Sequence, residues 1–273
     1  MIEPHTPGLS SHGYISIAEL VVYPIALVIT VFNCLRFGVK RGTGWIYLSL
    51  FCICRIVASA LVIAVEKSSD PSNGLIVAEM IVSSIALTPL TLAALGFLKT
   101  SAQLTLGQTM PKVLANLFRL SQLALTAAII LGIVGGVELG NDSTSATGHS
   151  LSRASVLLIT VVFAVLTAIS LYFLFFAPLQ SHSRTLVLGV TVSLPFLLVR
   201  IIYSLLYAFS SSTANKYSTL TGDWKIYLGM DVIMEFVVLA VLTTTGLVLQ
   251  KYVRNDTIQL VGPHSAYDME NYK

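Results

Sequence analysis

Long apolar runs separated by short polar segments dominate the chain, and seven of them are long enough to cross a membrane. A helix needs about 20 residues to span the hydrocarbon core of a bilayer. The runs show no barrel-type alternation, and backbone polar groups in lipid must be satisfied within their own segment, so each run is predicted to be a helix. The predicted spans cover residues 15–36, 45–65, 75–98, 113–136, 154–177, 185–209 and 224–249.

The composition agrees with an all-α membrane protein built as a bundle of seven transmembrane helices. Of the 273 residues, 55% are hydrophobic and only 11% are charged, whereas a soluble domain has about 25% charged residues. The pattern predicts a luminal or extracellular segment at 1–13, a membrane domain at 14–250 and a disordered cytosolic tail at 251–273.

The cations in the loops predict how the bundle is oriented. Positively charged residues favour the cytosolic side, so the N-terminus is expected to be luminal or outside and the C-terminus cytosolic. The Asn141-Asp142-Ser143 sequon then falls in a luminal segment, 137–153, and is a candidate glycosylation site. An endomembrane such as the endoplasmic reticulum is expected rather than the plasma membrane. The cations on the expected cytosolic side are Arg36, Lys40, Arg41, Lys99, Lys112, Arg184, Lys251 and Arg254.

Two stretches of the chain look alike and suggest an internal repeat. Arg55 and Arg200 each begin a similar apolar heptapeptide, and Glu79 and Glu235 each begin a similar segment in the following span. Spans one to three and five to seven would then form a parallel 3+1+3 repeat with the fourth span as a linker. Chance similarity between apolar helices is the alternative.

Ionisable residues within the spans mark the candidate site. A charge near the bilayer centre costs about 2.5–3.5 kcal/mol on insertion scales unless it faces protein or water. We therefore expect these side chains to converge in one interior cluster in the luminal half, in a pocket with tyrosine walls. The set comprises Arg55, Arg200, Glu79, Asp231 and Glu235, with Glu19 at the depth of Glu79 and Asp231, and Tyr23, Tyr203, Tyr207 and Tyr227 as walls.

The same residues have a purely structural interpretation. Arg55 with Glu235, and Arg200 with Asp231, would then be interhelical salt bridges that fix helix packing. The tyrosines would be ordinary residues of the membrane interface.

Other classes of site find no support in the sequence. The five histidines (His5, His12, His149, His182 and His264) are expected in tails or loops, so no metal, haem or other cofactor is expected. The chain has no phosphate-binding glycine loop, no nucleophile elbow and no basic patch for nucleic acid. The expected partners are the lipid bilayer and a lipophilic small molecule, and the sequence leaves the oligomeric state open.

Several segments resemble a largely uncharacterised family of fungal seven-helix integral membrane proteins. They are Gly-Trp-Ile-Tyr-Leu at 44–48, Leu-Gly-Ile-Val-Gly-Gly at 131–136, the stretch from Leu194 to Ser204, and Met-Glu-Phe-Val-Val at 234–238. The resemblance covers most of residues 14–250. Some members of this type occur with fungal meroterpenoid pathways, in which membrane-bound terpene cyclases, as in ascofuranone formation, have this size and plan.

The resemblance implies cyclisation of an epoxidised prenylated intermediate, started by a protonated carboxylic acid. A carboxyl group buried in low dielectric can stay protonated for this role. Glu235 is the first candidate acid, with Asp231 or Glu79 beside it and Arg55, Arg200, Tyr203, Tyr207 and Tyr23 around the substrate. If an arginine pairs directly with Glu235, the acid role passes to Glu79 or Asp231.

Two other function classes remain open at this point. A small-solute or lipid transporter would also use a midplane site with paired charges in a repeat architecture. A seven-helix sensor is the third class, although no receptor motif stands at a helix end.

Overall fold

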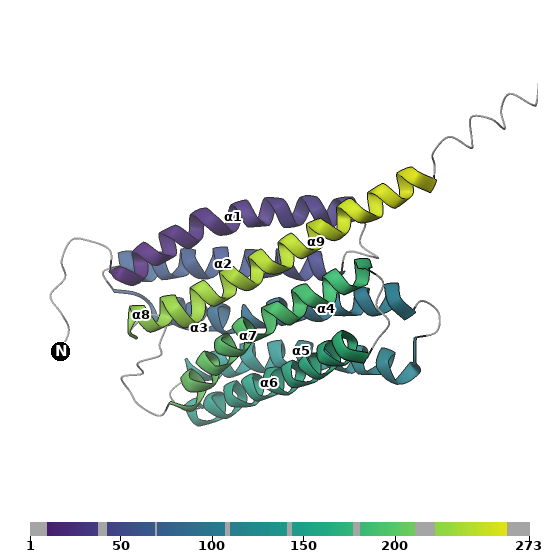
Figure 1. Cartoon of the computed structure of the whole chain (residues 1–273). Coiled ribbons are helices and arrows are strands. Elements are labelled where there is room, and N and C mark those ends of the chain that lie inside the picture. The colour runs from purple at the N-terminus through teal and green to yellow at the C-terminus, as the bar shows by residue number, and fades with distance from the viewer. Residues whose placement is uncertain are drawn as a thin grey trace, which may run out of the picture.

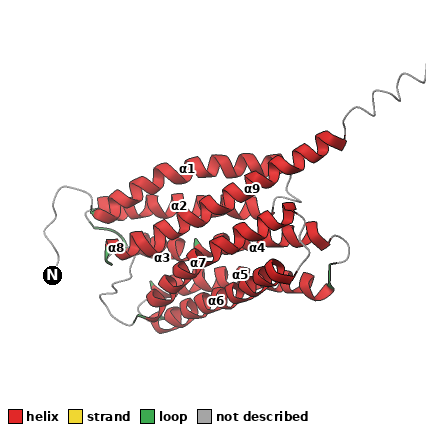
Figure 2. Cartoon of the chain, viewed as in Figure 1, coloured by secondary structure: helices red, strands yellow, loops and turns green. Residues whose placement is uncertain are grey.

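The structure, a computed structural model, describes residues 10–37, 43–68, 70–106, 110–140, 144–176, 181–210 and 222–260. These residues form an all-α bundle with no strand among them (Figures 1 and 2). The elements are α1 (Ser11–Phe37), α2 (Thr43–Lys67), α3 (Asn73–Ile85), α4 (Leu87–Leu106), α5 (Lys112–Leu139), α6 (Ser145–Phe176), α7 (Ser181–Phe209), α8 (Trp224–Tyr227), the π-helical η2 (Leu228–Val232) and α9 (Ile233–Leu260).

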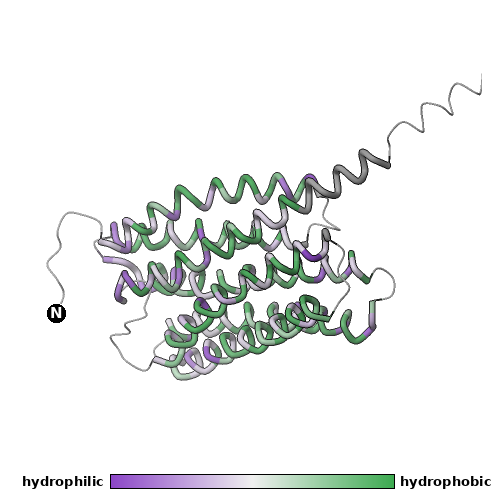
Figure 3. The backbone as a smooth tube through the Cα atoms, viewed as in Figure 1, coloured by the Kyte–Doolittle hydropathy of each residue, from purple (hydrophilic) through white to green (hydrophobic). Residues whose placement is uncertain are grey.

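Seven spans result, as the hydrophobic pattern predicts, because α3 joins α4 and α8 joins η2 and α9. Each is long and apolar enough to cross a membrane, and hydrophobic residues, drawn green in Figure 3, predominate in the long helices where the tube is coloured. The chain is therefore an integral multi-pass membrane protein with a seven-helix bundle fold.

Several helices extend beyond the predicted boundaries: α1 begins at Ser11 and not at 15, and α4 continues to Leu106, past the predicted end of the third span at 98. Most of the segment 137–153 is helical, because α5 continues to Leu139 and α6 begins at Ser145. In addition, α9 continues to Leu260, past the expected end of the membrane domain at 250. A helix needs no apolar side chains to continue beyond the bilayer, so hydropathy locates the membrane-crossing part and not the helix end. Asn141 and residues 261–273 lie outside the described part.

The third span lies at the centre of the bundle and is broken in the middle. Helix α4 packs against α2, α5, α6, α7 and α9, and almost all of its side chains from Leu87 to Leu98 are buried. The break between α3 and α4 falls at Ala86, three residues before Pro89. A proline ring clashes with the carbonyl group four residues earlier, here that of Ile85, so Pro89 ends α3 there. Pro24 and Pro195, in contrast, lie inside unbroken helices.

The two predicted triplets are α1 to α4, with α4 in the third span, and α6 to α9. In each triplet the middle span contacts the spans before and after it: α2 packs on α1, α3 and α4, and α7 packs on α6 and α9. Contacts between consecutive spans occur in any antiparallel bundle, so the 3+1+3 repeat stays a prediction. Helix α5 packs mainly on α6, so the linker joins the second triplet.

Glycines allow the close crossing of α5 and α6. A Cβ atom on Gly135 would lie 2.9 Å from the backbone nitrogen of Ser152, and one on Gly148 would lie 2.6 Å from that of Leu139. Small residues at such crossings let membrane helices approach closely. The Gly135 position in the 131–136 segment therefore serves packing, not phosphate binding.

Candidate functional site

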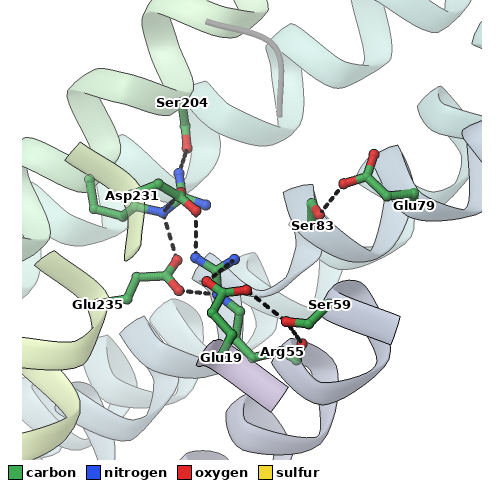
Figure 4. Close-up of polar contacts among 9 residues, drawn as sticks. Glu19, Arg55, Ser59, Glu79, Ser83, Ser204, Asp231 and Glu235 are labelled. Carbon is green, nitrogen blue, oxygen red and sulfur yellow. Dashed lines mark hydrogen bonds and ion pairs between the residues drawn. The ribbon is translucent and has the colours of Figure 1, made fainter. Parts of the chain in front are cut away.

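Two arginines and two carboxylates form a buried, crossed network at the interface of α2, α7, η2 and α9 (Figure 4). Arg55 donates through Nη2 to Asp231 Oδ2 at 2.5 Å and through Nε to Glu235 Oε2. Arg200 Nε donates to Glu235 Oε1 at 2.6 Å and lies 2.6 Å from Asp231 Oδ1. Because the single Nε–H points to Glu235, the contact of Arg200 with Asp231 is an ion pair without a hydrogen bond.

These four residues meet as the sequence predicts. Both predicted pairs are present, and each arginine also contacts the partner of the other. All four residues are at most 4% exposed. A buried ion pair is tolerated when further hydrogen bonds satisfy its polar atoms, and Arg200 Nη1 donates one to Ser204 at 2.7 Å.

Glu19 brings a third carboxylate to the network. Its Oε1 lies 3.9 Å from Arg55 Nη1, and its Oε2 accepts a hydrogen bond from Ser59 at 2.6 Å. Each of the two serine hydroxyls is thus hydrogen-bonded to a side chain of the network, Ser59 to Glu19 and Ser204 to Arg200. With Glu19 included, the network holds one more carboxylate than guanidinium groups.

A π-helical segment carries Asp231. Residues Leu228–Val232 form η2 between α8 and α9. Such segments are rare, and they occur frequently at functional sites. Asp231 and Glu235 are four residues apart and both reach Arg55 and Arg200 from this segment and the first turn of α9.

Glu79 stands apart from the network, so the prediction of a single cluster is wrong in this respect. Its side chain is fully buried on α3, and its Oε1 accepts a hydrogen bond from Ser83 at 2.7 Å. Its Oε2 has no hydrogen-bond partner among the described residues, and Figure 4 shows it away from Arg55. Glu79 and Asp231 lie at similar depth, but depth does not determine which way a helix face is turned.

A small cavity lies between Ser83, the hydrogen-bond partner of Glu79, and Arg200. Its volume is about 40 Å³. Ser83 lines the cavity, whereas Glu79 does not line it but accepts a hydrogen bond from Ser83. The guanidinium of Arg200 lies over the Tyr203 ring, 5.5 Å from its centroid. The lining residues are Met80, Ser83, Ser84, Leu87, Ser152, Val156, Ile159, Arg200, Tyr203, Ser204, Tyr207 and Asp231.

The predicted tyrosine walls are present only in part. Tyr203 and Tyr207 line the cavity. Tyr23 does not: it is buried on α1 and packs edge-on against Phe51, with ring centroids 5.8 Å apart. Tyr227 is buried on α8, against the ring of His12. The aromatic side chains therefore belong to two separate polar regions.

His12 corrects the expectation that all histidines lie in tails or loops. It occupies the first turn of α1, is 8% exposed, and its Nε2 lies 3.1 Å from the carbonyl oxygen of Gly222. His149 and His182 also lie in helices, α6 and α7. The apolar run of span one begins at Ile15, so hydropathy places His12 outside the helix. In the described part of the chain, no group of three or more His, Cys, Asp and Glu side chains is placed to hold a metal ion.

Comparison with known proteins gives a family without an assigned activity. Residues 9–252 match a family described as a domain of unknown function, DUF7702. Searches of curated proteins and of solved structures each found no significant match. The match includes all seven spans, both arginines and all four buried carboxyl groups, and the chain therefore belongs to the DUF7702 family.

Proposed function

We propose that the chain is a membrane-bound enzyme that cyclises a lipophilic, epoxidised prenylated substrate, with Glu79 as the acid that starts the reaction. The observation that carries this proposal is a fully buried carboxyl group that has no cation partner among the described residues. It is hydrogen-bonded to Ser83, which lines a cavity with tyrosine in its wall. The resemblance to membrane-bound cyclases of meroterpenoid pathways supports the same chemistry.

Glu79 suits the acid role better than Glu235 does. A proton donor must be neutral before it reacts, and Glu235 accepts from both Arg55 and Arg200, which hold it as a carboxylate. Asp231 is bound by the same two cations. An unpaired carboxylate at the position of Glu79 would cost several kcal/mol, so we expect Glu79 to carry a proton.

The proposed reaction is an isomerisation. Glu79 transfers its proton to the epoxide oxygen, the carbon–oxygen bond breaks, and the electron pair of a neighbouring double bond forms the new carbon–carbon bond. The cation at the far end of the chain loses a proton to the Glu79 carboxylate, directly or through water, which restores the acid. The face of Tyr207 can stabilise the passing cation by about 0.5–2 kcal/mol. Protons and electrons balance without a cofactor.

Substrate binding requires the cavity to open. Sites for ligands of drug size have volumes of about 300–1,000 Å³, whereas this cavity has about 40 Å³. The helix is already interrupted at Ala86, so this position is the natural hinge for a movement of α3 relative to α4. In the proposal, outward movement of α3 enlarges the cavity and brings Glu79 to the substrate.

The proposal is tested with microsomes from a heterologous fungus that expresses the chain. A prenylated phenol with a terminal epoxide is supplied, and products are separated by retention time and mass. We expect a product of unchanged mass and new retention time that microsomes from the empty host do not form. A product heavier by one water would indicate simple hydrolysis. Absence of the isomeric product with several such substrates would contradict the cyclase proposal.

A transporter of lipids or small solutes is the second candidate. The observation in its favour is the charge network at the junction of the two triplets, because coupling ions and substrates of transporters bind near such junctions. If microsomes form no cyclic product, uptake of labelled lipids or solutes into vesicles containing the purified chain becomes the relevant assay.

We also propose that the N-terminus lies on the luminal side, as the loop cations predict, and cysteine labelling tests this orientation. In a background without the native cysteines, a cysteine replacing Ala146, exposed at the start of α6, is expected to react with an impermeant thiol reagent from the luminal side. A cysteine replacing Gln103, exposed near the end of α4, is the matched control and should react only from the cytosol. The reverse pattern would overturn this orientation.

A further inference from the structure

One face of α1 buries four polar side chains that each leave an atom without a hydrogen-bond partner among the described residues. The atoms are Nδ1 of His12, Oγ of Ser16, Oε1 of Glu19 and the hydroxyl of Tyr23. Each side chain is more than nine-tenths buried: His12 is 8% exposed, and the other three at most 4%. None of them belongs to the cavity beside Glu79.

The four residues form a continuous line. They are spaced by four, three and four residues, which puts them on one side of a helix. At a rise of 1.5 Å per residue the line is about 16 Å long, roughly half of the hydrocarbon core. It starts in the first turn of α1 and reaches Glu19, which contacts Arg55 of the charge network.

Burial of such a line requires an explanation in energetic terms. Each buried polar atom without a partner destabilises the fold by about 1–3 kcal/mol. With four such atoms along one helix face, we expect hydrogen bonds from another source to offset this cost. Water molecules in polar sites typically make about three hydrogen bonds to groups of this kind. A file of water along α1 would supply partners to all four side chains.

Glu19 is suited to receive a proton at the end of this line. The network contains one carboxylate more than guanidinium groups, and Glu19 makes its weakest contact, 3.9 Å from Arg55. Asp231 and Glu235 are each held by both arginines. One further proton would therefore bind most easily at Glu19, and it would balance the charge of the network.

We propose that this face of α1 is a proton path from the end of the bundle where α1 begins to Glu19. A proton from bulk water passes along His12, Ser16 and intervening water, and the Glu19 carboxylate becomes a carboxylic acid. The imidazole of His12 suits the entrance, because Nε2 lies 3.1 Å from the carbonyl oxygen of Gly222 and the buried Nδ1 has no hydrogen-bond partner among the described residues. This inference goes beyond the proposed function and does not depend on it.

The surroundings of Glu19 connect proton uptake to the rest of the bundle. A proton on Glu19 weakens its attraction to Arg55 and leaves the two other carboxylates as the only anions of the network. Glu19 contacts Arg55 and Ser59 on α2. The other ionisable groups close enough to interact with its charge are Asp231 in η2, Glu235 on α9, Tyr227 on α8, and Tyr23 on its own helix.

Infrared difference spectroscopy on the full chain in lipid nanodiscs tests where the proton binds. Lowering the pH should produce the carbonyl band of a newly protonated carboxylic acid. We expect Glu19→Gln, which is nearly isosteric, to lack this band, and Glu79→Gln to retain it. Persistence of the band in Glu19→Gln would overturn the assignment. Because Glu79 carries the cyclase proposal, these two variants distinguish failure of one idea from failure of the other.

The rate of uptake after a rapid drop in pH tests the path. Ser16→Leu places an apolar side chain in the line, and we expect the band to appear at least about tenfold more slowly at unchanged final amplitude. Ala18→Leu, on the exposed side of the same helix, is the matched control and should leave the rate unchanged. Should Ser16→Leu not fold, Ser16→Val is measured in the same way. Equal rates in the Ser16 variant and the Ala18 control would contradict the path.

Discussion

Replacement of Arg55 by leucine is expected to lower the stability of the bundle by about 3–5 kcal/mol, the usual cost of removing one partner from a buried ion pair. The change leaves Asp231 and Glu235 with Arg200 as their shared cation and removes the guanidinium that pairs with Glu19. A loss of this size is a large part of the stability of a typical domain. Thermal unfolding of purified protein in detergent, followed by size-exclusion chromatography, measures the effect.

Two further variants show whether the effect comes from unpaired buried charge. Arg153 is only partly buried, where it donates to the carbonyl of Ala208, so Arg153→Leu should cost about 1 kcal/mol. Adding Glu235→Leu to Arg55→Leu removes an unpaired carboxylate and should restore part of the stability. If the double variant is less stable than Arg55→Leu by as much as Glu235→Leu alone destabilises the wild type, the two changes are additive. Unpaired charge in the network would then not be the source of the stability lost in Arg55→Leu.

Glu79→Gln is expected to reduce turnover by about 100-fold or more, the usual contribution of a positioned general acid. The amide keeps the shape of the side chain and can still accept a hydrogen bond from Ser83, but it has no proton to transfer. Because a neutral amide replaces a neutral acid, the amount of folded protein should stay near that of wild type. The measurement is the rate of cyclic product formation in microsomes, divided by the amount of folded protein.

Glu138→Gln is the matched control for this variant. It makes the same chemical change on α5, outside the cavity lining, and should leave turnover unchanged. Equal turnover in Glu79→Gln and Glu138→Gln would show that Glu79 is not the acid.

The seven spans follow from hydropathy because lipid imposes one rule on every membrane segment. A segment that crosses the bilayer must be apolar and helical over a fixed length, and the predicted and observed spans agree. The break at Ala86 illustrates the limit of this reasoning. Three prolines lie within predicted spans, but only Pro89 ends a helix. The sequence alone does not show which neighbouring helices stabilise a kink at the other two.

The sequence predicts which residues form the site and how deep in the membrane they lie, but it does not predict how each helix is rotated about its own axis. The cost of exposing charge to lipid indicates that Arg55, Arg200, Asp231 and Glu235 face inward, and they do. The same argument puts Glu79 with them and gives Glu19 no special role, whereas Glu19 joins the network and Glu79 does not. Depth counts residues from the end of a span, but a contact also depends on how each helix is turned about its axis. The π-helical turn at Asp231 changes that rotation locally.

The polar line on α1 was also detectable in principle. His12, Ser16, Glu19 and Tyr23 follow a helical spacing that the sequence displays. Hydropathy obscures it because apolar residues on the exposed side of α1 dominate the average over each window. The signal that could have revealed it is a polar stripe at intervals of three and four residues within an apolar run.

The central claim is that chemistry takes place at Glu79 while the paired carboxylates hold the bundle together. The most direct test compares cyclic product formed per folded molecule by Glu79→Gln and Glu235→Gln in the same microsomal assay. Glu235→Gln is expected to give less folded protein, since Arg55 and Arg200 lose an anionic partner, but to keep turnover per folded molecule. Glu79→Gln should fold normally and lose turnover. An active Glu79→Gln beside a well-folded but inactive Glu235→Gln would contradict this account.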